Sequence, residues 1–163
     1  MSGDSVNIGG GTMQVFGSLA DIPAGFGPTV AAVGNFDGVH CGHREILGAV
    51  KAEARNLGAR AIAITFEPHP EQVLRPAQAP RLITPNAERM RWLAETGIDA
   101  AVVLPFDEAL KNLSPRAFVE QILVGALRVR SVHEGRNFRF GNGAAAGVEA
   151  VAAMGAELGF AVH

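Results

Sequence analysis

Short, uninterrupted apolar runs alternate along this chain with longer segments of helical periodicity, and this alternation limits the fold more than any other feature. The apolar runs occupy residues 29–33, 61–66, 100–104 and 160–162, and residues 129–132 are predicted to form a weaker strand. Strands that are apolar along their whole length belong in a parallel sheet with helices on both faces. The sequence therefore predicts an α/β protein with a doubly wound parallel sheet.

The segments between these runs carry signals for helix starts and helix ends. The first helical pattern covers residues 46–57, and Gly58 is a typical residue to end it. Thr84-Pro85 and Ser114-Pro115 each combine a capping hydroxyl with a proline at the first helical position. A helix is therefore expected to begin at each of these pairs, and a further helix is expected over residues 148–158.

The N-terminal residues lack a pattern of this kind. Residues 1–12 include three consecutive glycines at 9–11 and no apolar run, so they are predicted to form a flexible tail. Met13–Phe16 is expected to be a short edge strand. Residues 13–163 are of a length that fits one domain.

Charge and cysteine content exclude several classes of partner. The formal net charge is −2 and the sequence holds no block of Lys or Arg, which argues against a nucleic acid or a membrane surface as partner. No apolar run approaches the length of a membrane span. The one cysteine, Cys41, allows no disulfide within the chain and fits a cytoplasmic protein. The sequence does not indicate an oligomeric state.

Residues 34–43, with the sequence GNFDGVHCGH, lie between the first apolar run and the first helical pattern. A strand that turns into a helix N-terminus offers unpaired N–H groups and the positive end of a helix dipole, and both suit phosphate. The glycines let the backbone approach a ligand closely. His40 and His43 add imidazole donors at the same place. The segment is therefore predicted to bind phosphate.

Several common nucleotide and hydrolase motifs are absent from the sequence. It lacks the Walker A motif of P-loop kinases, a Gly-x-Gly-x-x-Gly after the first strand, and the Gly-x-Ser-x-Gly elbow. His40 and His43 also lack a His-Glu-x-x-His frame, so zinc is disfavoured as their ligand. No metal ligand is assigned to the protein.

Two further segments follow apolar runs in the same way. Residues 67–70, Glu-Pro-His-Pro, are expected to form a stiff loop because two prolines interrupt regular structure. Residues 135–147 form a loop rich in glycine. The carboxyl ends of parallel strands lie at one edge of the sheet, where ligands bind near a topological switch point. All three segments are therefore expected to converge there.

The histidine pair resembles the His-x-Gly-His signature of the nucleotidyltransferase superfamily. Three more motifs follow residues 34–40 in a fixed order and narrow the resemblance. They are residues 65–70 (TFEPHP), residues 113–115 (LSP) with Phe118, and residues 135–141 (GRNFRFG). Together the four motifs resemble the adenylyltransferase module of prokaryotic FAD synthetase, the bifunctional riboflavin kinase/FMN adenylyltransferase, from about Met13 to the last residue.

The resemblance implies a Rossmann-like fold and a reaction in which FMN and ATP give FAD and pyrophosphate. It assigns His40 and His43 to catalysis on the triphosphate. The ATP-binding residues that it implies are Gly34, Asn35, Phe36, Asp37, Gly38 and Gly42. The residues that it implies for the flavin or nucleotide pocket are Phe66, Glu67, Pro68, His69, Pro70, Asn137, Phe138, Arg139 and Phe140. Mg²⁺ is expected to enter with ATP, held mostly by substrate and water.

The residues leave some roles open. Asp37 either orients a histidine or stabilises the Asp-Gly turn in which it lies. Glu67 either reaches the pocket or belongs to a rigid turn. Phe138 and Phe140 either contact a planar ring or belong to the core, with Asn137 as the ligand contact.

The chain also departs from the family pattern. It ends at His163, before a Ser/Thr- and Arg-containing segment that helps to hold the triphosphate in the family, and it lacks the riboflavin kinase barrel. Residues 144–148 are apolar where the family has charges, and His133-Glu134 is polar where the family strand is apolar. A truncated module with impaired turnover and no riboflavin kinase activity is expected. The alternatives are a nucleotide- or flavin-binding module without turnover, or a nucleotidyltransferase for another small molecule.

Overall fold

A single seven-stranded sheet in the order β1-β2-β5-β4-β3-β6-β7 organises the computed structural model, which describes residues 3–9 and 11–163. Neighbouring strands from β2 to β7 are parallel, and only β1 runs antiparallel, next to β2. The strands are β1 (Asp4–Ile8), β2 (Gly11–Phe16), β3 (Thr29–Val33), β4 (Arg60–Glu67), β5 (Ala100–Pro105), β6 (Val129–His133) and β7 (Ala161–Val162). The predicted parallel α/β fold is confirmed.

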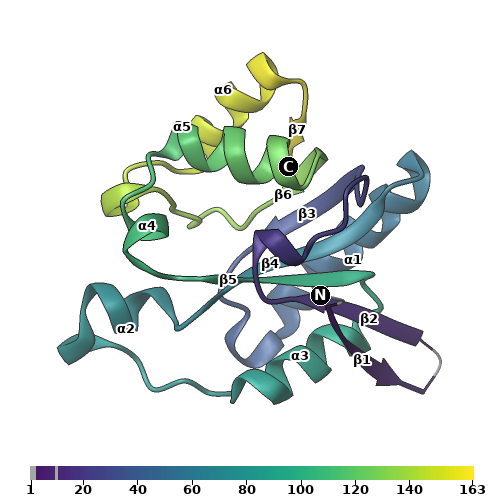
Figure 1. Ribbon diagram of the computed structural model, residues 1–163, viewed down its shortest axis with the longest axis horizontal. Helices are drawn as coiled ribbons and strands as arrows, with labels where there is room; N and C mark the ends of the chain where they lie inside the picture. The colour runs from purple at the N-terminus through teal and green to yellow at the C-terminus, as the bar shows by residue number, and fades with distance from the viewer. Residues whose placement is uncertain (1–2, 10) are drawn as a thin grey trace.

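Helices cover both faces of this sheet (Figure 1). The regular helices are α1 (Cys41–Leu57), α2 (Pro70–Leu74), α3 (Asn86–Glu95), α4 (Glu108–Lys111), α5 (Pro115–Ala117) and α6 (Val148–Leu158), with a π-helix, η4 (Phe118–Ala126), continuing α5. Short 3₁₀ turns occur at η1 (Leu19–Asp21), η2 (Asp37–Val39), η3 (Pro76–Gln78) and η5 (Asn142–Ala144). Helices α1 and α3 pack on one face, while η4 and α6 belong to the other layer. None of the helices in the described residues is both long and apolar enough to cross a membrane.

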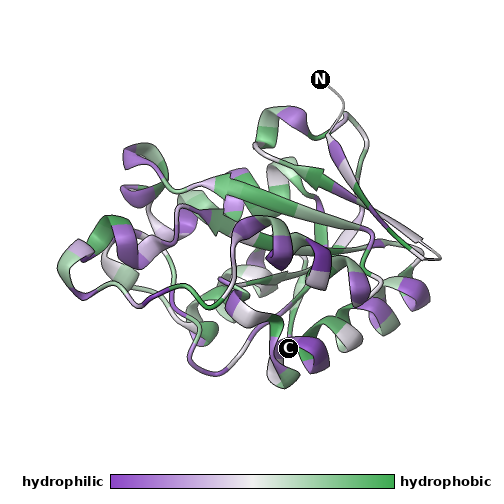
Figure 2. Cartoon of the chain, turned by 90° about the horizontal axis from the view of Figure 1, so that it is seen from below, coloured by the Kyte–Doolittle hydropathy of each residue, from purple (hydrophilic) through white to green (hydrophobic). Residues whose placement is uncertain are grey.

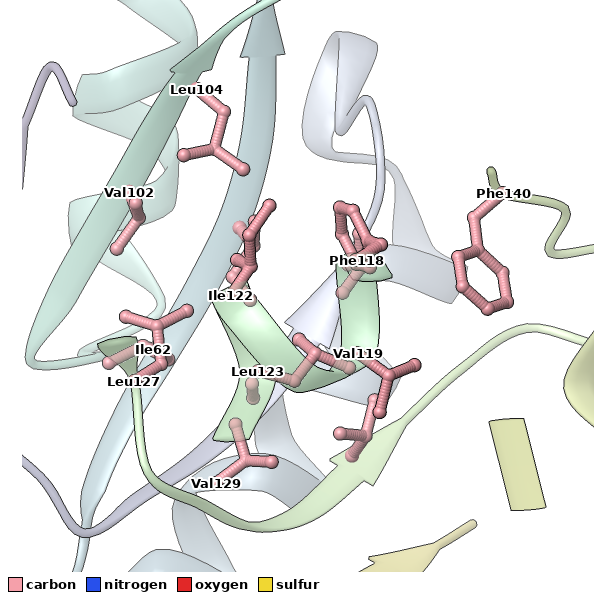
Figure 3. Close-up of a cluster of buried hydrophobic side chains, with 14 of the residues drawn as sticks. Ile62, Val102, Leu104, Phe118, Val119, Ile122, Leu123, Leu127, Val129 and Phe140 are labelled. Carbon is pink, nitrogen blue, oxygen red and sulfur yellow. The ribbon is translucent and has the colours of Figure 1, made fainter. Parts of the chain in front are cut away.

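Each face of the sheet has its own hydrophobic core because side chains alternate along a strand. In β4, Ala63 faces the core beneath α1, whereas Ile62 and Ile64 face the core beneath η4. Figure 3 shows Ile122 of η4 among the side chains of this second core, in the same cluster as Ile62 and Val102. Figure 2 shows hydrophobic strands enclosed by helices of mixed polarity. The apolar strands are therefore buried on both faces, as a parallel sheet requires.

The prediction of a flexible tail over residues 1–12 was wrong for Asp4–Ile8, which forms β1 and pairs with β2. Met1, Ser2 and Gly10 lie outside the described residues. The prediction that Met13–Phe16 is an edge strand was also wrong, because β2 lies between β1 and β5. β1 contains no apolar run, and its side chains are mostly exposed.

The two expected helix starts differ in outcome. Ser114 caps α5 by accepting a hydrogen bond from the N–H of Ala117 at 3.1 Å, as predicted. At the other start, Pro85 itself is the cap residue of α3, and the Thr84 hydroxyl accepts from the N–H of Gly38 instead, at 2.9 Å. The expected capping role of Thr84 was therefore wrong, and its hydroxyl serves the turn after β3.

Gly141 and Gly143 provide a matched test of how the loop after β6 is held. Gly141 has φ 78° and ψ 174°, a conformation almost restricted to glycine, and an added Cβ would lie 2.6 Å from Cγ of Pro115. Gly143 has φ 66° with open space around it. We expect Gly141→Ala to lower the free energy of unfolding by about 3 kcal/mol and Gly143→Ala by about 1 kcal/mol. Urea unfolding measures both, and equal losses would contradict this account.

Candidate active site

The turn after β3 places the predicted phosphate-binding residues. The N–H of Gly34 still bonds to the carbonyl of Ile64, so the strand pairing continues to this point. The chain then reverses through Phe36, Gly38 and Val39, which all have positive φ, at 51°, 77° and 39°. It enters α1 with His40 as the N-cap residue. The predicted strand–turn–helix arrangement is present.

Asp37 holds this turn against the segment that precedes α3. Its carboxylate accepts hydrogen bonds from the N–H groups of Ile83, at 2.9 and 3.1 Å, and of Thr84, at 3.0 Å. The N–H of Gly38 donates in turn to the Thr84 hydroxyl. The geometry therefore supports the interpretation in which Asp37 stabilises the turn.

His40 and His43 stack at the start of α1, with ring centroids 3.6 Å apart and 22° between the ring planes. Nδ1 of His40 accepts the N–H of Gly42 at 3.1 Å, so the neutral His40 ring carries its proton on Nε2. The edge of Phe36 lies against His43, with 5.2 Å between centroids. The pair is therefore fixed in orientation before any ligand binds.

The pKa of His43 is lowered to about 4, because burial disfavours the charged ring and His40 adds repulsion; Asp37 opposes the shift. His43 is therefore neutral at pH 7. Its Nδ1 is buried and has no hydrogen-bond partner within the described residues. A neutral ring with its proton on Nε2 avoids burying an unpaired N–H and keeps one donor for a ligand.

Two cavities adjoin this turn. The first, of about 350 Å³, contains His40, His43 and Gly42 in its wall and reaches Glu134 and Asn137. It also lies at the N-terminus of α1, the positive end of the helix dipole. Imidazole donors and a helix N-terminus together suit a polyphosphate. We call this the histidine cavity.

The second cavity, of about 370 Å³, is rich in aromatic side chains. Phe66 and Phe106 meet edge to face at 5.9 Å, and Phe138 stacks on Phe140 at 5.5 Å. Arg139 adds a cation to the wall. Such a wall suits a planar ring that carries a negative group. We call this the aromatic cavity.

The two cavities share part of their walls. Gly34, Asn137 and Phe138 line both. Gly34 directly follows β3, and the other two belong to the loop after β6, the parallel neighbour of β3. Parallel pairing thus brings both loops to one edge of the sheet, and ligands in the two cavities would meet there.

The family model of FAD synthetase matches residues 23–163. The chain belongs to the FAD synthetase family. It is 36% identical over 131 residues to a bifunctional riboflavin kinase/FMN adenylyltransferase of Escherichia coli K12, a match that covers 80% of this chain and 42% of that protein. It is 33% identical over 151 residues to the Pseudomonas fluorescens protein of the same name, covering 93% of this chain and 48% of that protein. The chain thus spans less than half the length of these relatives.

A solved structure supports the fold of this family member. The crystal structure titled as a macrolide-efflux protein from Streptococcus pneumoniae has a TM-score of 0.74 with 22% sequence identity, and it covers 93% of this chain and 50% of that chain. At this identity the likeness concerns the fold alone. The seven-stranded, mostly parallel sheet is therefore Rossmann-like, as the resemblance implied.

The predicted site residues divide into those that reach a cavity and those that do not. Those that line one or both cavities are Gly34, Asn35, Phe36, His40, Gly42, His43, Phe66, Pro70, Asn137, Phe138, Arg139 and Phe140. Asp37, Gly38, Glu67, Pro68 and His69 line neither cavity. Phe140 is buried in the core and also lines the aromatic cavity, so both interpretations of this residue hold in part.

The expected loop at residues 67–70 is shorter than predicted. β4 extends to Glu67, and Pro70 is already the first residue of α2. Nδ1 of the buried His69 caps this helix by accepting the N–H of Glu71 at 3.1 Å. The prediction was wrong because proline at the first helical position begins a helix rather than preventing one.

Arg89 is a positioning residue that the sequence reasoning missed. Its side chain is 3% exposed and donates to the carbonyl oxygen of Asn35 at 3.0 Å and of Phe66 at 3.3 Å. It also bonds to Glu67 at 3.1 Å and to Asn86 at 2.8 Å. Arg89 therefore joins the turn after β3 to the end of β4. A detectable signal was present, since Arg89 lies beside Met90 in the buried stripe of α3.

Glu134 is a second missed residue. Its carboxyl accepts the N–H of Val33 at 3.0 Å and lines the histidine cavity. Burial raises the pKa of Glu134 well above its ordinary value, although the Val33 bond opposes this. From the sequence, this position was noted only because Glu134 is polar where the strand of the family is apolar.

Arg89→Met tests the bridge between the two strand ends. The change leaves two carbonyl oxygens and the Glu67 carboxylate without their donor, so we expect the free energy of unfolding to fall by about 3 kcal/mol. Urea unfolding measures the loss. Arg91→Met, at an exposed position of the same helix, is the control and should change stability by less than about 0.5 kcal/mol. A similar small effect of both substitutions would refute the bridging role.

The lowered pKa of His43 makes stability depend on pH. Between about pH 4 and pH 6.5 the unfolded chain binds a proton at His43 that the folded chain does not, so this residue lowers the free energy of unfolding as the pH falls. We expect the stability difference between wild type and His43→Gln to shift against wild type as the pH falls through this window. Urea unfolding at several pH values measures it.

Glu134 changes stability with pH in the opposite direction to His43. Its contribution cancels in the difference between wild type and His43→Gln. Its raised pKa keeps a proton in the folded chain that the unfolded chain loses above about pH 4.5, which lowers stability as the pH rises. Because both proteins contain Glu134, the difference between them isolates His43. A difference that stays constant from pH 7 to pH 4 would show that His43 titrates normally.

Proposed function

We propose that this chain is an FMN adenylyltransferase, with residues 13–163 as its adenylyltransferase domain, joining FMN and ATP to give FAD and pyrophosphate. The proposal rests mainly on the observation that the histidine cavity and the aromatic cavity share a wall at Gly34, Asn137 and Phe138. A transferase with two substrates needs two adjoining sites of different chemistry. The printed names of the relatives, riboflavin kinase/FMN adenylyltransferase, support these substrates.

The histidine cavity suits the triphosphate of ATP. Nε2–H of His40 and of His43 would donate to phosphate oxygens, and the N-terminus of α1 adds its positive dipole. Bound phosphate would also raise the pKa of His43 from about 4, because a nearby negative charge favours the imidazolium. The ring would then supply charge where the leaving pyrophosphate needs it.

The aromatic cavity suits the flavin of FMN. Phe66 and Phe138 offer ring surfaces, and Arg139 offers a cation for the FMN phosphate. A phosphate oxygen of FMN would attack the α-phosphorus of ATP in line. A bond forms between this oxygen and the α-phosphorus. The bond between the α-phosphorus and the oxygen that bridges it to the β-phosphorus breaks, and pyrophosphate leaves with the electron pair of that bond. Positioning supplies much of the acceleration in such a step.

Neither Glu134 in the wall of the histidine cavity nor Asp37 in the adjoining turn fits a dedicated Mg²⁺ site. Both oxygens of Asp37 accept backbone hydrogen bonds, and burial favours the uncharged form of Glu134. Mg²⁺ prefers charged oxygen ligands and retains water. We therefore propose that Mg²⁺ enters with ATP and is held by phosphate oxygens and water.

The exposed free thiol of Cys41 is compatible with a cytoplasmic enzyme.

Incubation of the protein with FMN, ATP and Mg²⁺, followed by chromatography of the flavins, tests the proposal. We expect FAD and pyrophosphate in equal amounts. Riboflavin should give no product, because it lacks the attacking phosphate. His43→Ala should reduce turnover by at least about 100-fold while leaving the fold intact by circular dichroism.

Arg91→Met, which is remote from both cavities, is the control for this assay and should retain wild-type turnover. Two outcomes contradict the proposal. One is binding of both substrates without FAD formation. The other is near-normal FAD formation by His43→Ala.

A further inference from the structure

Glu53, His133 and His163 come together outside the histidine pair. Nε2 of His133 lies 2.5 Å from Oε2 of Glu53, and Nε2 of His163 lies 3.5 Å from Oε1 of the same carboxylate. One ligand atom from each of the three residues lies within 4.8 Å of the other two. The Ser131 hydroxyl donates to Oε2 of Glu53 at 2.9 Å. Three elements far apart in sequence thus place metal-ligating atoms at one point.

The backbone brings the two histidines together. β6 and β7 pair in parallel, with Val132 opposite Val162, so His133 and His163 are the next residues along the two strands. Backbone hydrogen bonds continue the pairing past β7, from the N–H of His163 to Val132 and from the N–H of Glu134 to His163. The ring centroids of the two histidines are 4.8 Å apart. Their proximity is therefore set by strand register and does not depend on a chance rotamer.

We propose that Glu53, His133 and His163 bind a divalent transition-metal ion, with Zn²⁺ as the ion that this donor set suits best. Two imidazole nitrogens and one carboxylate oxygen are typical Zn²⁺ ligands and leave a fourth position for water. Mg²⁺ and Ca²⁺ prefer oxygen donors and suit the set poorly. The sequence disfavoured zinc at His40 and His43, and this site uses neither.

The surroundings prepare the carboxylate for this role. The Glu53 carboxylate is held at this point by hydrogen bonds to Ser131 and His133. Ser131 also orients the carboxylate, as the outer partners of metal ligands commonly do. Binding requires Glu53 and His133 to separate, because an ion lies about 2.0–2.2 Å from each donor atom. His163 is half exposed and has room to turn toward the ion.

The ion would stabilise the packing of the helix and strands that support the proposed active site. α1 carries Glu53 and also His43 in its first turn, with His40 as its N-cap residue. His133 lines the histidine cavity and comes just before the loop that follows β6. An ion bound by all three ligands therefore links α1 to β6 and β7 and takes no part in the transfer itself. Binding only to the folded chain raises its stability.

Titration of chelator-treated protein with Co²⁺ and with Zn²⁺, in excess Mg²⁺, tests the site without any activity assay. We expect one ion per chain, seen as visible Co²⁺ absorption of a site with nitrogen ligands and as heat of Zn²⁺ binding. Zn²⁺ should also raise the melting temperature. His133→Gln and His163→Gln should each remove both signals, and Ser131→Ala should weaken Zn²⁺ binding about tenfold.

His163→Gln keeps the test decisive, because this half-exposed position is not part of either hydrophobic core. The control is His40→Gln combined with His43→Gln, which removes the other close pair of histidines and should leave the stoichiometry at one. The proposal is overturned if wild-type protein binds neither ion. It is equally overturned if binding survives in His163→Gln or is lost in the His40/His43 control.

Discussion

The turn between β3 and α1 is the constraint on which the rest of the site depends. A buried strand must lead into a helix that packs over it, and the chain achieves this with Phe36, Gly38 and Val39 at positive φ. Such conformations are unfavourable for phenylalanine and valine, so contacts from elsewhere must hold them. Asp37 and Arg89 provide these contacts by bonding the turn to the start of α3 and to the end of β4. The histidines are therefore placed by residues that do not line either cavity.

The sequence predicted the fold well where local pattern and burial agree. Apolar strands, Gly58 as a helix end and Ser114 as a cap are all decided by short-range physics, and the structure has them. β1 escaped prediction because only Val6 and Ile8 are apolar, and both are only partly buried against the core. A strand with two half-buried apolar residues leaves little trace in hydropathy.

The sequence singled out the turn after β3 and the loop after β6, which both line a cavity, but not the residues that support them. The histidine pair follows from a motif whose spacing reports local structure. Arg89 and Glu134 act through bonds to backbone atoms of Asn35, Phe66 and Val33, and these partners are set by tertiary packing. A buried charge in an apolar stripe signals that some partner exists, but the sequence does not identify which one.

Parallel pairing explains why two clusters of different chemistry lie close together. From Ser131 onward the residues of β6 alternate between the faces of the sheet, so Ser131 and His133 point toward α1 while Val132 joins the core beneath η4. The loop that follows carries Asn137 to the wall shared by the two cavities. One strand thus contributes to a polar cluster under the helix and, directly after it, to the edge of the sheet where the two cavities meet.

The wall of the histidine cavity contains Arg136 and two titratable groups, His43 and Glu134, whose pKa values are shifted toward the uncharged forms by burial. Burial keeps His43 neutral at pH 7 and shifts the pKa of Glu134 upward, toward the protonated form. A folded chain with several unpaired buried charges would be less stable. A polyphosphate changes this balance, because its negative charge favours the imidazolium form of His43. The low pKa of His43 in the free protein and the charged role proposed for it beside a polyphosphate would both follow from the same buried position.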